Sequence, residues 1–167
     1  MESVRSVGDI SVTSHNGGPT VALSVKVFRL QKRIIRIMTG KRNKDSCRKL
    51  FKGLEIFPLP SLYIYFLLWF VRKNMDQFTT NNNVHNINTR IRHNFHIPTV
   101  NLKKYQTGVF YMGIKIFNSL PTYVKNELTY STKFISLVKN FLCENSFYSL
   151  EEYFSSCKRP KQKSGFY

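Results

Sequence analysis

The run Leu62 to Val71 (LYIYFLLWFV) decides the fold, because it is the one long apolar stretch of the chain. It falls well short of the roughly 20 residues that a helix needs to cross a bilayer, and Arg72 and Lys73 close it. Pro60 suits the first turn of a helix, where the missing N–H has no partner to lose. We therefore predict a helix from Pro60 to about Asn74 as the central element of the core, with a strand as the alternative.

A regular apolar pattern precedes this run and predicts an amphipathic helix that ends near Gly40, a residue suited to a C-terminal cap. The apolar positions at helical spacing are Leu23, Val27, Leu30, Ile34 and Ile37. The cations on the opposite side are Lys26, Arg29, Arg33 and Arg36. We expect the apolar stripe to be buried and the cations to form an exposed basic ridge.

A short helix is predicted between these two, from Ser46 to Lys52, with Asp45 as its N-terminal cap. Its inward residues would be Cys47, Leu50 and Phe51. Gly53 would end it.

Three helices are predicted in the C-terminal half. One ends before Pro121, one is capped by Ser131, and a last short one begins with a capping box of Ser149 and Glu152. The residues expected on their apolar faces are Phe110, Ile114, Phe117, Phe134, Val138, Phe141 and Leu142. The chain is thus expected to be all-α, with about five or six helices in one small, irregular domain.

The composition divides the 167 residues into five segments. These are a flexible lead (1–22), the basic helices with the central apolar helix (23–76), a polar loop or linker (77–100), the C-terminal helices (101–155) and a basic tail (156–167). We expect the lead and the tail to be disordered, because they are polar and lack hydrophobic periodicity.

The charge points to a polyanionic partner. Lys and Arg number 26 against nine Asp and Glu, a net charge of +17, so the partner is a nucleic acid or, as the competing explanation, an anionic membrane surface. The cations are densest around the first two predicted helices, where Asp45 alone opposes them. The candidate phosphate contacts there are Arg29, Lys32, Arg33, Arg36, Lys41, Arg42, Lys44, Arg48 and Lys49, with Arg90 and Arg92 as a second group.

Catalytic signatures are absent from the sequence. Metal-dependent polymerases and nucleases need clustered carboxylates, whereas the three aspartates Asp9, Asp45 and Asp76 are isolated. The adjacent Glu151 and Glu152 complement a helix N-terminus. We therefore predict no enzyme activity, no cofactor and no small-molecule substrate.

Histidine and cysteine give no stronger signal. His85, His93 and His96 lie close in sequence, but a metal site needs further ligands, so solvated or phosphate-facing histidines are the preferred interpretation. Cys47, among cations, is either a reactive thiol or, as we prefer, a buried inert one. Three dispersed cysteines and an N-terminus without an apolar stretch indicate an intracellular protein, in the nucleus or the cytoplasm.

A string of motifs resembles a known family. The motifs are FRLQKRIIRIMTG (28–40), DSCRKLFKGLEIFPLPSLYIYFLLWFV (45–71), His85 with NTR (88–90), YMGIK (111–115) leading to NSLP (118–121), and YSLEEYF (148–154). In this order they resemble the region after the polymerase domain in reverse transcriptases of jockey-like non-LTR retrotransposons. The resemblance covers about Val27 to Phe154, with departures at Phe66, Ile87 and Gly108-Val109.

The resemblance implies an RNA-directed DNA polymerase as the parent protein, with its catalytic aspartates upstream of this region. It implies a helical extension that grips the nucleic-acid backbone and a missing polymerase domain as a further partner. The first hypothesis is a non-catalytic fragment with at most nonspecific binding to RNA or DNA. The alternative is an inert or domesticated helical interaction module, which exposed apolar patches would favour. Membrane association is the third and least favoured hypothesis.

Overall fold

The computed structural model describes residues 19–85, 94–99 and 101–158, and these residues form an all-α fold, as predicted. Within them the chain runs through α1 (Pro19–Met38), α2 (Arg48–Gly53), α3 (Leu59–Lys73), α4 (Asn81–His85), α5 (Lys103–Gln106), α6 (Val109–Ser119), α7 (Thr122–Lys125), α8 (Ser131–Asn145) and α9 (Leu150–Lys158), with one 3-10 turn at Met75–Gln77. Sheet pairing in the described part is limited to one isolated bridge between Thr80 and Phe95. The helices α4, α5 and α7 were not predicted.

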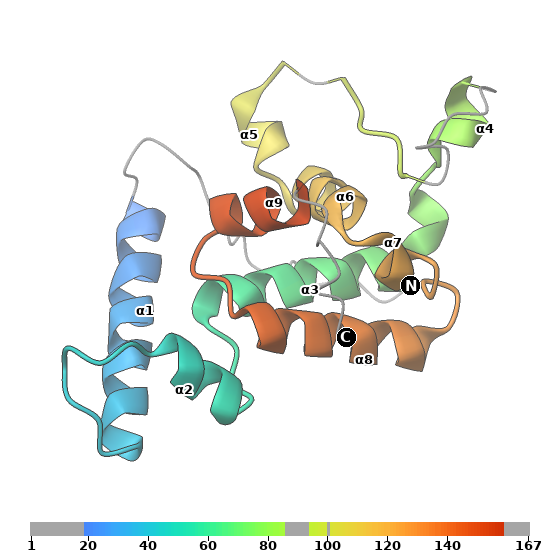
Figure 1. The fold of residues 1–167 in the computed structure, drawn as a ribbon. Helices are drawn as coiled ribbons and strands as arrows, with labels where there is room; N and C mark the ends of the chain where they lie inside the picture. Colours follow the sequence, from blue (N-terminus) through green and yellow to red (C-terminus); the bar gives the residue numbers. More distant parts are fainter. Residues whose placement is uncertain (1–18, 86–93, 100, 159–167) are drawn as a thin grey trace, which may run out of the picture.

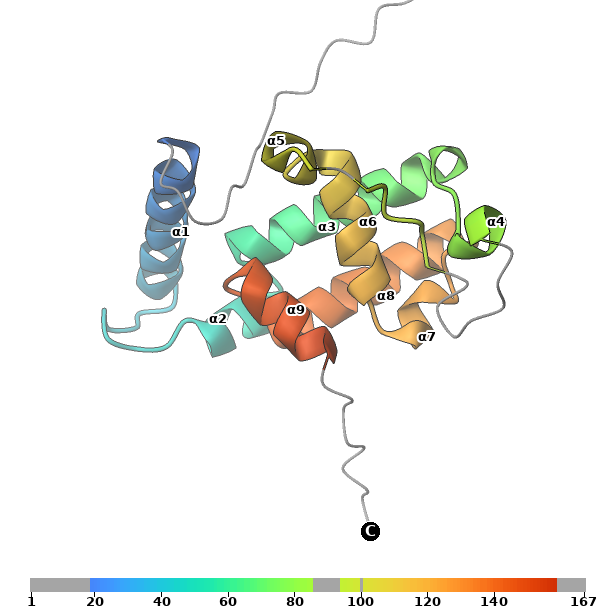
Figure 2. The same cartoon turned by 90° about the horizontal axis from the view of Figure 1, so that it is seen from above.

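The predicted central helix is confirmed as α3, with Pro60 in its first turn. In Figure 1, α3 and α8 lie side by side, and α6 and α9 lie next to each other over α3. In the view from above in Figure 2, α6 crosses α3 and α8, and α1 stands beside the start of α3. The central position follows from the sequence, because α3 has large apolar residues on almost every side.

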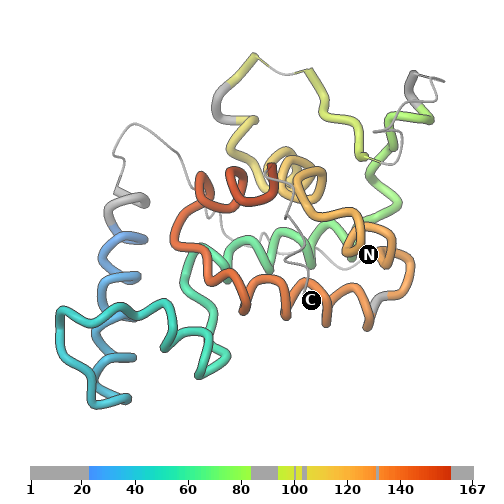
Figure 3. Tube along the Cα trace, viewed as in Figure 1, coloured from blue at the N-terminus to red at the C-terminus, as the bar shows by residue number. Residues whose placement is uncertain are grey.

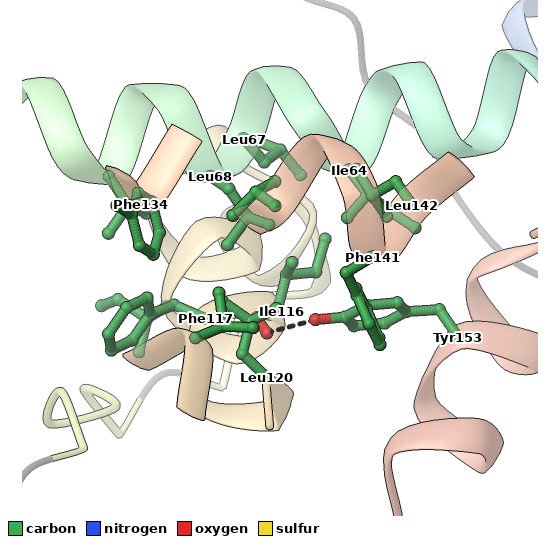
Figure 4. Packing of buried hydrophobic residues seen from close by; sticks show 14 of the residues in the cluster. Ile64, Leu67, Leu68, Ile116, Phe117, Leu120, Phe134, Phe141, Leu142 and Tyr153 are labelled. Carbon is green, nitrogen blue, oxygen red and sulfur yellow. Dashed lines mark hydrogen bonds between the residues drawn. The ribbon is translucent and has the colours of Figure 1, made fainter. Parts of the chain in front are cut away.

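The main core fills the space between α3, α6, α8 and α9. Figure 4 shows buried side chains from all four helices converging there. Ile114, Phe117, Phe134, Val138, Phe141 and Leu142 are buried as predicted, and Phe110 is partly buried. Tyr153 of α9 is fully buried, and its hydroxyl donates a hydrogen bond of 2.9 Å to the carbonyl of Ile116. This bond satisfies the one polar atom of the ring inside an apolar core.

A second, smaller core joins α1 and α2 to this body. It contains the buried Ile35, Cys47 and Phe51, with Phe28, Leu50, Ile56 and Tyr148 packed around them. The ring of Phe28 meets the edge of Tyr148 with centroids 5.1 Å apart. The Cα trace in Figure 3 shows the result: α1 stands at one edge of the molecule, and the chain returns through α2 into α3.

Several expected helix ends are corrected by one to four residues. The first helix starts at Pro19 instead of Leu23, and α2 starts at Arg48 instead of Ser46. Asp45 does not cap α2, because its carboxylate accepts a bond of 3.0 Å from the backbone amide of Arg42 in the preceding turn. The helix α8 begins at Ser131, but its N-cap position is Tyr130. Half of the predicted capping box of α9 is present, since Ser149 Oγ accepts a bond of 3.1 Å from the Glu152 amide, whereas the Glu152 carboxylate accepts from the amide of Tyr148 instead of Ser149.

The segment predicted as a polar linker holds α4 and is tied to the body. The amide of Phe95 donates to Asn118 Oδ1 at 2.9 Å, and Asn118 Nδ2 donates to the Phe95 carbonyl at 2.7 Å. Most of the predicted lead (1–18) and tail (159–167) lie outside the described residues.

Gly113 sets how closely α3 and α6 approach. A Cβ atom at this position would lie 2.8 Å from Val71 Cγ2, closer than real side chains come. We predict that Gly113→Ala lowers the free energy of unfolding by about 1–2 kcal/mol in urea titrations, because overpacking outweighs the better helix propensity of alanine. Gly53→Ala is the matched control, since nothing lies within 4 Å of its added Cβ, and it should be neutral or stabilising. Equal effects of the two substitutions would contradict this close approach.

Candidate nucleic-acid interface

The first helix has three distinct faces, about 120° apart by helical geometry. One face packs on the body through Phe28 and Ile35. Gln31 lies on the same face, and its side chain donates to the Phe57 carbonyl at 2.8 Å and accepts from the Leu59 amide at 3.0 Å. The second carries the basic ridge, and the third the apolar stripe. The helix therefore uses only one of its two apolar faces for the fold.

The prediction that the apolar stripe is buried was wrong. Each of its five side chains exposes between 49% and 69% of its area; they are Leu23, Val27, Leu30, Ile34 and Ile37. The reason is that Phe28 packs against both Phe51 and Tyr148 while Ile35 joins the same cluster, and these contacts turn the stripe away from the body. The signal was present in the sequence, because Phe28 and Ile35 lie off the stripe and form an apolar face of their own.

The basic ridge is confirmed as an exposed surface along α1 for three of its four predicted cations. Lys26, Arg29 and Arg33 are exposed on the same side of the helix. The ion pairs within the described residues join Arg48 to Glu152 and Lys133 to Glu127, so neither uses a ridge cation. Cations of this kind offer their charge to an external anion at little structural cost.

Gly40 directs the chain from the ridge into a second group of cations. Its φ of +64° is left-handed, and Lys41 N–H donates to the Arg36 carbonyl at 2.9 Å, which completes a Schellman cap. The loop beyond is held by Arg36 Nε, which donates to the Asp45 carbonyl at 3.0 Å. The exposed cations of this loop and of α2 are Lys41, Arg42, Lys44, Arg48, Lys49 and Lys52, of which Arg48 is paired with Glu152. Ridge and loop thus form one basic surface across consecutive elements.

Three predicted contacts have other partners in the structure. Lys32 lies toward the body, with Nζ 4.6 Å from the centroid of the Phe28 ring. Arg48 makes a two-point ion pair with Glu152 and stacks on Tyr148, with Cζ 4.5 Å from the ring centroid. Arg36 is half-buried, and its Nε donates to the Asp45 carbonyl. Arg90 and Arg92, the second predicted group, lie outside the described residues.

Glu152 joins three elements. Partial burial alone would raise the pKa of its carboxyl, but hydrogen bonds from Arg48 and from the Tyr148 amide, at 2.8 Å, outweigh burial and lower that pKa. A lowered pKa means that the ionised carboxylate stabilises the fold above the pKa of the unfolded chain, and that this stabilisation is lost as the pH falls through the folded pKa.

We predict that Glu152→Gln lowers the free energy of unfolding by about 1 kcal/mol or less at pH 7, since the pair is largely exposed. The difference from the wild type should shrink as the pH falls through the lowered pKa of Glu152, because a protonated Glu152 is neutral like glutamine. Urea titrations across this pH range provide the measurement. Glu144→Gln removes the same charge from an exposed position of α8 and is the control. A difference that stays constant down to acidic pH would exclude the ionised form as the cause.

The metal-binding candidates are not brought together among the residues that the structure describes. Within the described ranges no group of three His, Cys, Asp or Glu is close enough to hold a metal ion, and His93 lies outside those ranges. Cys47 is buried, as preferred, with Sγ 3.6 Å from the Lys32 carbonyl oxygen. Glu152 has the structural role described above.

Several residues of the motifs that resemble the retrotransposon family make contacts that stabilise the fold. Asn118 holds the segment around Phe95, Gly113 allows α3 and α6 to pack closely, and Tyr153 bonds across the core. Lys125, which the sequence did not single out, donates from Nζ to the Asn118 carbonyl at 2.6 Å and to Asn94 Oδ1 at 3.0 Å. These motif residues therefore hold the architecture, whereas the first two motifs (28–40 and 45–71) also carry much of the basic surface, including Arg29, Arg33 and Lys49.

Comparison of the chain with protein-family models, with curated proteins and with solved structures finds no match. Among the described helices, none combines the length and the apolar character that crossing a membrane requires.

Proposed function

We propose that this chain is a non-catalytic helical fragment that binds the phosphate backbone of RNA or DNA through the basic surface of α1, the following loop and α2. The observation that carries the proposal is the exposure of these cations on consecutive elements, in a chain with a net charge of +17. Each phosphate contact releases counterions, which favours association without reading the base sequence. Such a role places the protein in the nucleus or the cytoplasm.

The parent that we propose is the reverse transcriptase of a jockey-like non-LTR retrotransposon, on the strength of the motif string between Val27 and Phe154. In that setting the basic surface would hold template or primer backbone beside a polymerase domain contributed by another part of the parent protein. The proposal includes no nucleotide transfer, because the three aspartates are isolated in the sequence and no group of three His, Cys, Asp or Glu among the described residues could hold a metal ion.

The experiment is an anisotropy titration of labelled single-stranded RNA and duplex DNA, each in two unrelated sequences, at about 50 mM salt, where backbone contacts are strong. The proposal expects binding to each with similar affinity for the two sequences of a pair. Absence of binding at this salt concentration would remove it. A strong preference for one sequence would also contradict it, because backbone contacts do not discriminate between bases.

A second candidate is a helical protein-interaction module without a nucleic-acid role. The observation in its favour is the exposed apolar surface, which includes the stripe on α1 and the aromatic residues Phe66 and Trp69 on α3. Such surfaces on a folded protein indicate contact with a partner. If the chain binds no nucleic acid in the titration above, this candidate takes its place.

A further inference from the structure

The apolar stripe of α1 has the residue pattern of a two-stranded coiled coil. Its members are spaced by four, three, four and three residues, which is the a/d repeat of a heptad. Val27 and Ile34 occupy the a positions, and Leu23, Leu30 and Ile37 occupy the d positions. In parallel pairs, β-branched residues at a with leucine at d favour two helices over three or four. The pattern therefore specifies one helix as the occupant.

The charge beside the stripe defines the chemistry of that helix. Lys26 and Arg33 occupy the g positions of the heptad, next to the stripe on the side away from the body, and both are exposed. The helix Pro19–Met38 contains no Asp or Glu. Residues at e and g of paired coiled-coil helices form the interhelical ion pairs that set partner choice. We propose that the stripe docks one amphipathic helix of a partner protein, with Asp or Glu at the positions that flank its apolar seam.

A second copy of this chain fits the surface less well. Pairing two copies of α1 would bring together two helices that carry cations without acidic residues, in two chains of net charge +17 each. Like charges of this density oppose association. An acidic helix gains from the same cations.

An anionic membrane also fits less well than a helix. A helix that lies in a membrane interface presents a broad apolar face with aromatic residues, whereas this stripe is only the two positions of a heptad seam and is entirely aliphatic. Phe28, the one aromatic residue of α1, packs inside against Tyr148. The narrow aliphatic stripe thus favours a helix as the partner over the surface of a membrane.

The inference does not depend on nucleic-acid binding, because the stripe and the basic ridge are separate faces of α1. The two functions meet at Lys26 and Arg33, which border the stripe and belong to the ridge. An acidic helix on the stripe would therefore weaken binding of a nucleic acid to these two residues. The surface spans about two heptads, so an affinity in the micromolar range is expected.

The test uses the full chain and two designed peptides of three heptads, both with Ile at a and Leu at d. One peptide has Glu at e and g, and the other has Lys there. Calorimetric titration should show binding of the Glu peptide and at least about tenfold weaker binding of the Lys peptide, as charge complementarity requires. Leu30→Gln with Ile34→Gln should weaken binding of the Glu peptide by at least about tenfold, because two aliphatic side chains no longer pack.

Val25→Gln is the matched control, since Val25 is an exposed aliphatic residue of α1 outside the stripe. It should leave binding within about twofold, and circular dichroism should show all variants folded, because every substituted side chain is exposed. Equal binding of the two peptides, or equal losses in the control and the stripe variant, would overturn the proposal. Two further outcomes would overturn it if the wild type does not bind the Glu peptide. One is dimerisation of the wild type, measured by sedimentation, that the stripe variant loses. The other is binding of the wild type to phosphatidylserine vesicles that the stripe variant loses.

Discussion

Replacing Arg29 and Arg33 together by glutamine should weaken nucleic-acid binding about tenfold to fiftyfold at 0.1 M salt. The two guanidinium groups lie on the exposed ridge of α1, and neither takes part in the ion pairs of the described residues. Each lost phosphate contact lowers the affinity and makes the salt dependence shallower by about one unit of slope. The loss should be the same for unrelated sequences, because backbone contacts are removed and no base contact changes.

The control removes the same net charge elsewhere. Lys139→Gln with Lys158→Gln changes two exposed lysines, on α8 and α9, and should weaken binding by no more than about threefold through the long-range field. Anisotropy titrations of all three proteins with the same duplex give the comparison. Equal losses in the two double variants would mean that total charge, and not the basic surface of α1, determines binding.

Replacing Phe117 by alanine should lower the free energy of unfolding by about 3–5 kcal/mol, a large part of the stability of a domain this size. Phe117 exposes only 2% of its area, and its ring centroid lies 4.6 Å from that of Phe95 and 6.5 Å from that of Phe134. It lies where α6 meets α8 and the segment around Phe95. The surrounding rings come from separate elements and cannot all move in to fill the cavity.

Phe66→Ala serves as the matched control, because it deletes the same ring from an exposed position of α3. Its effect on the free energy of unfolding should stay within about 0.5–1 kcal/mol. Urea titrations followed by circular dichroism measure both variants. If Phe117→Ala were no more destabilising than Phe66→Ala, the result would contradict the position of Phe117 in the core between α3, α6 and α8.

The sequence predicted the long helices because their patterns are regular over several turns. The apolar run of α3, the periodic faces of α6 and α8, and the capping box of α9 each have a local physical cause that acts wherever the helix lies. The helices α4, α5 and α7 have four or five residues each. Segments this short contain too few positions to show a period, and tertiary contacts such as those of Asn118 decide their conformation.

The exposure of the cations was predicted more reliably than the contacts that individual cations make within the fold. A run of cations opposed by one aspartate marks a basic surface in any conformation. Some cations contact side chains of the fold that lie far away in the sequence: Arg48 contacts Glu152, and Lys32 contacts Tyr148. The orientation of α1 was mistaken for the same reason, since the period of an apolar stripe does not tell whether the rest of the chain offers a surface to cover it.

The salt dependence of binding tests the central claim most directly. The association constant of the wild-type chain for a labelled duplex is measured between about 50 and 200 mM salt, the range over which counterion release is resolved. If the basic surface of α1, the loop and α2 holds at least three phosphates, the logarithm of this constant should fall linearly with the logarithm of the salt concentration, with a slope of about −3 or steeper. A slope near zero, or no association at the lowest salt concentration, would contradict the account.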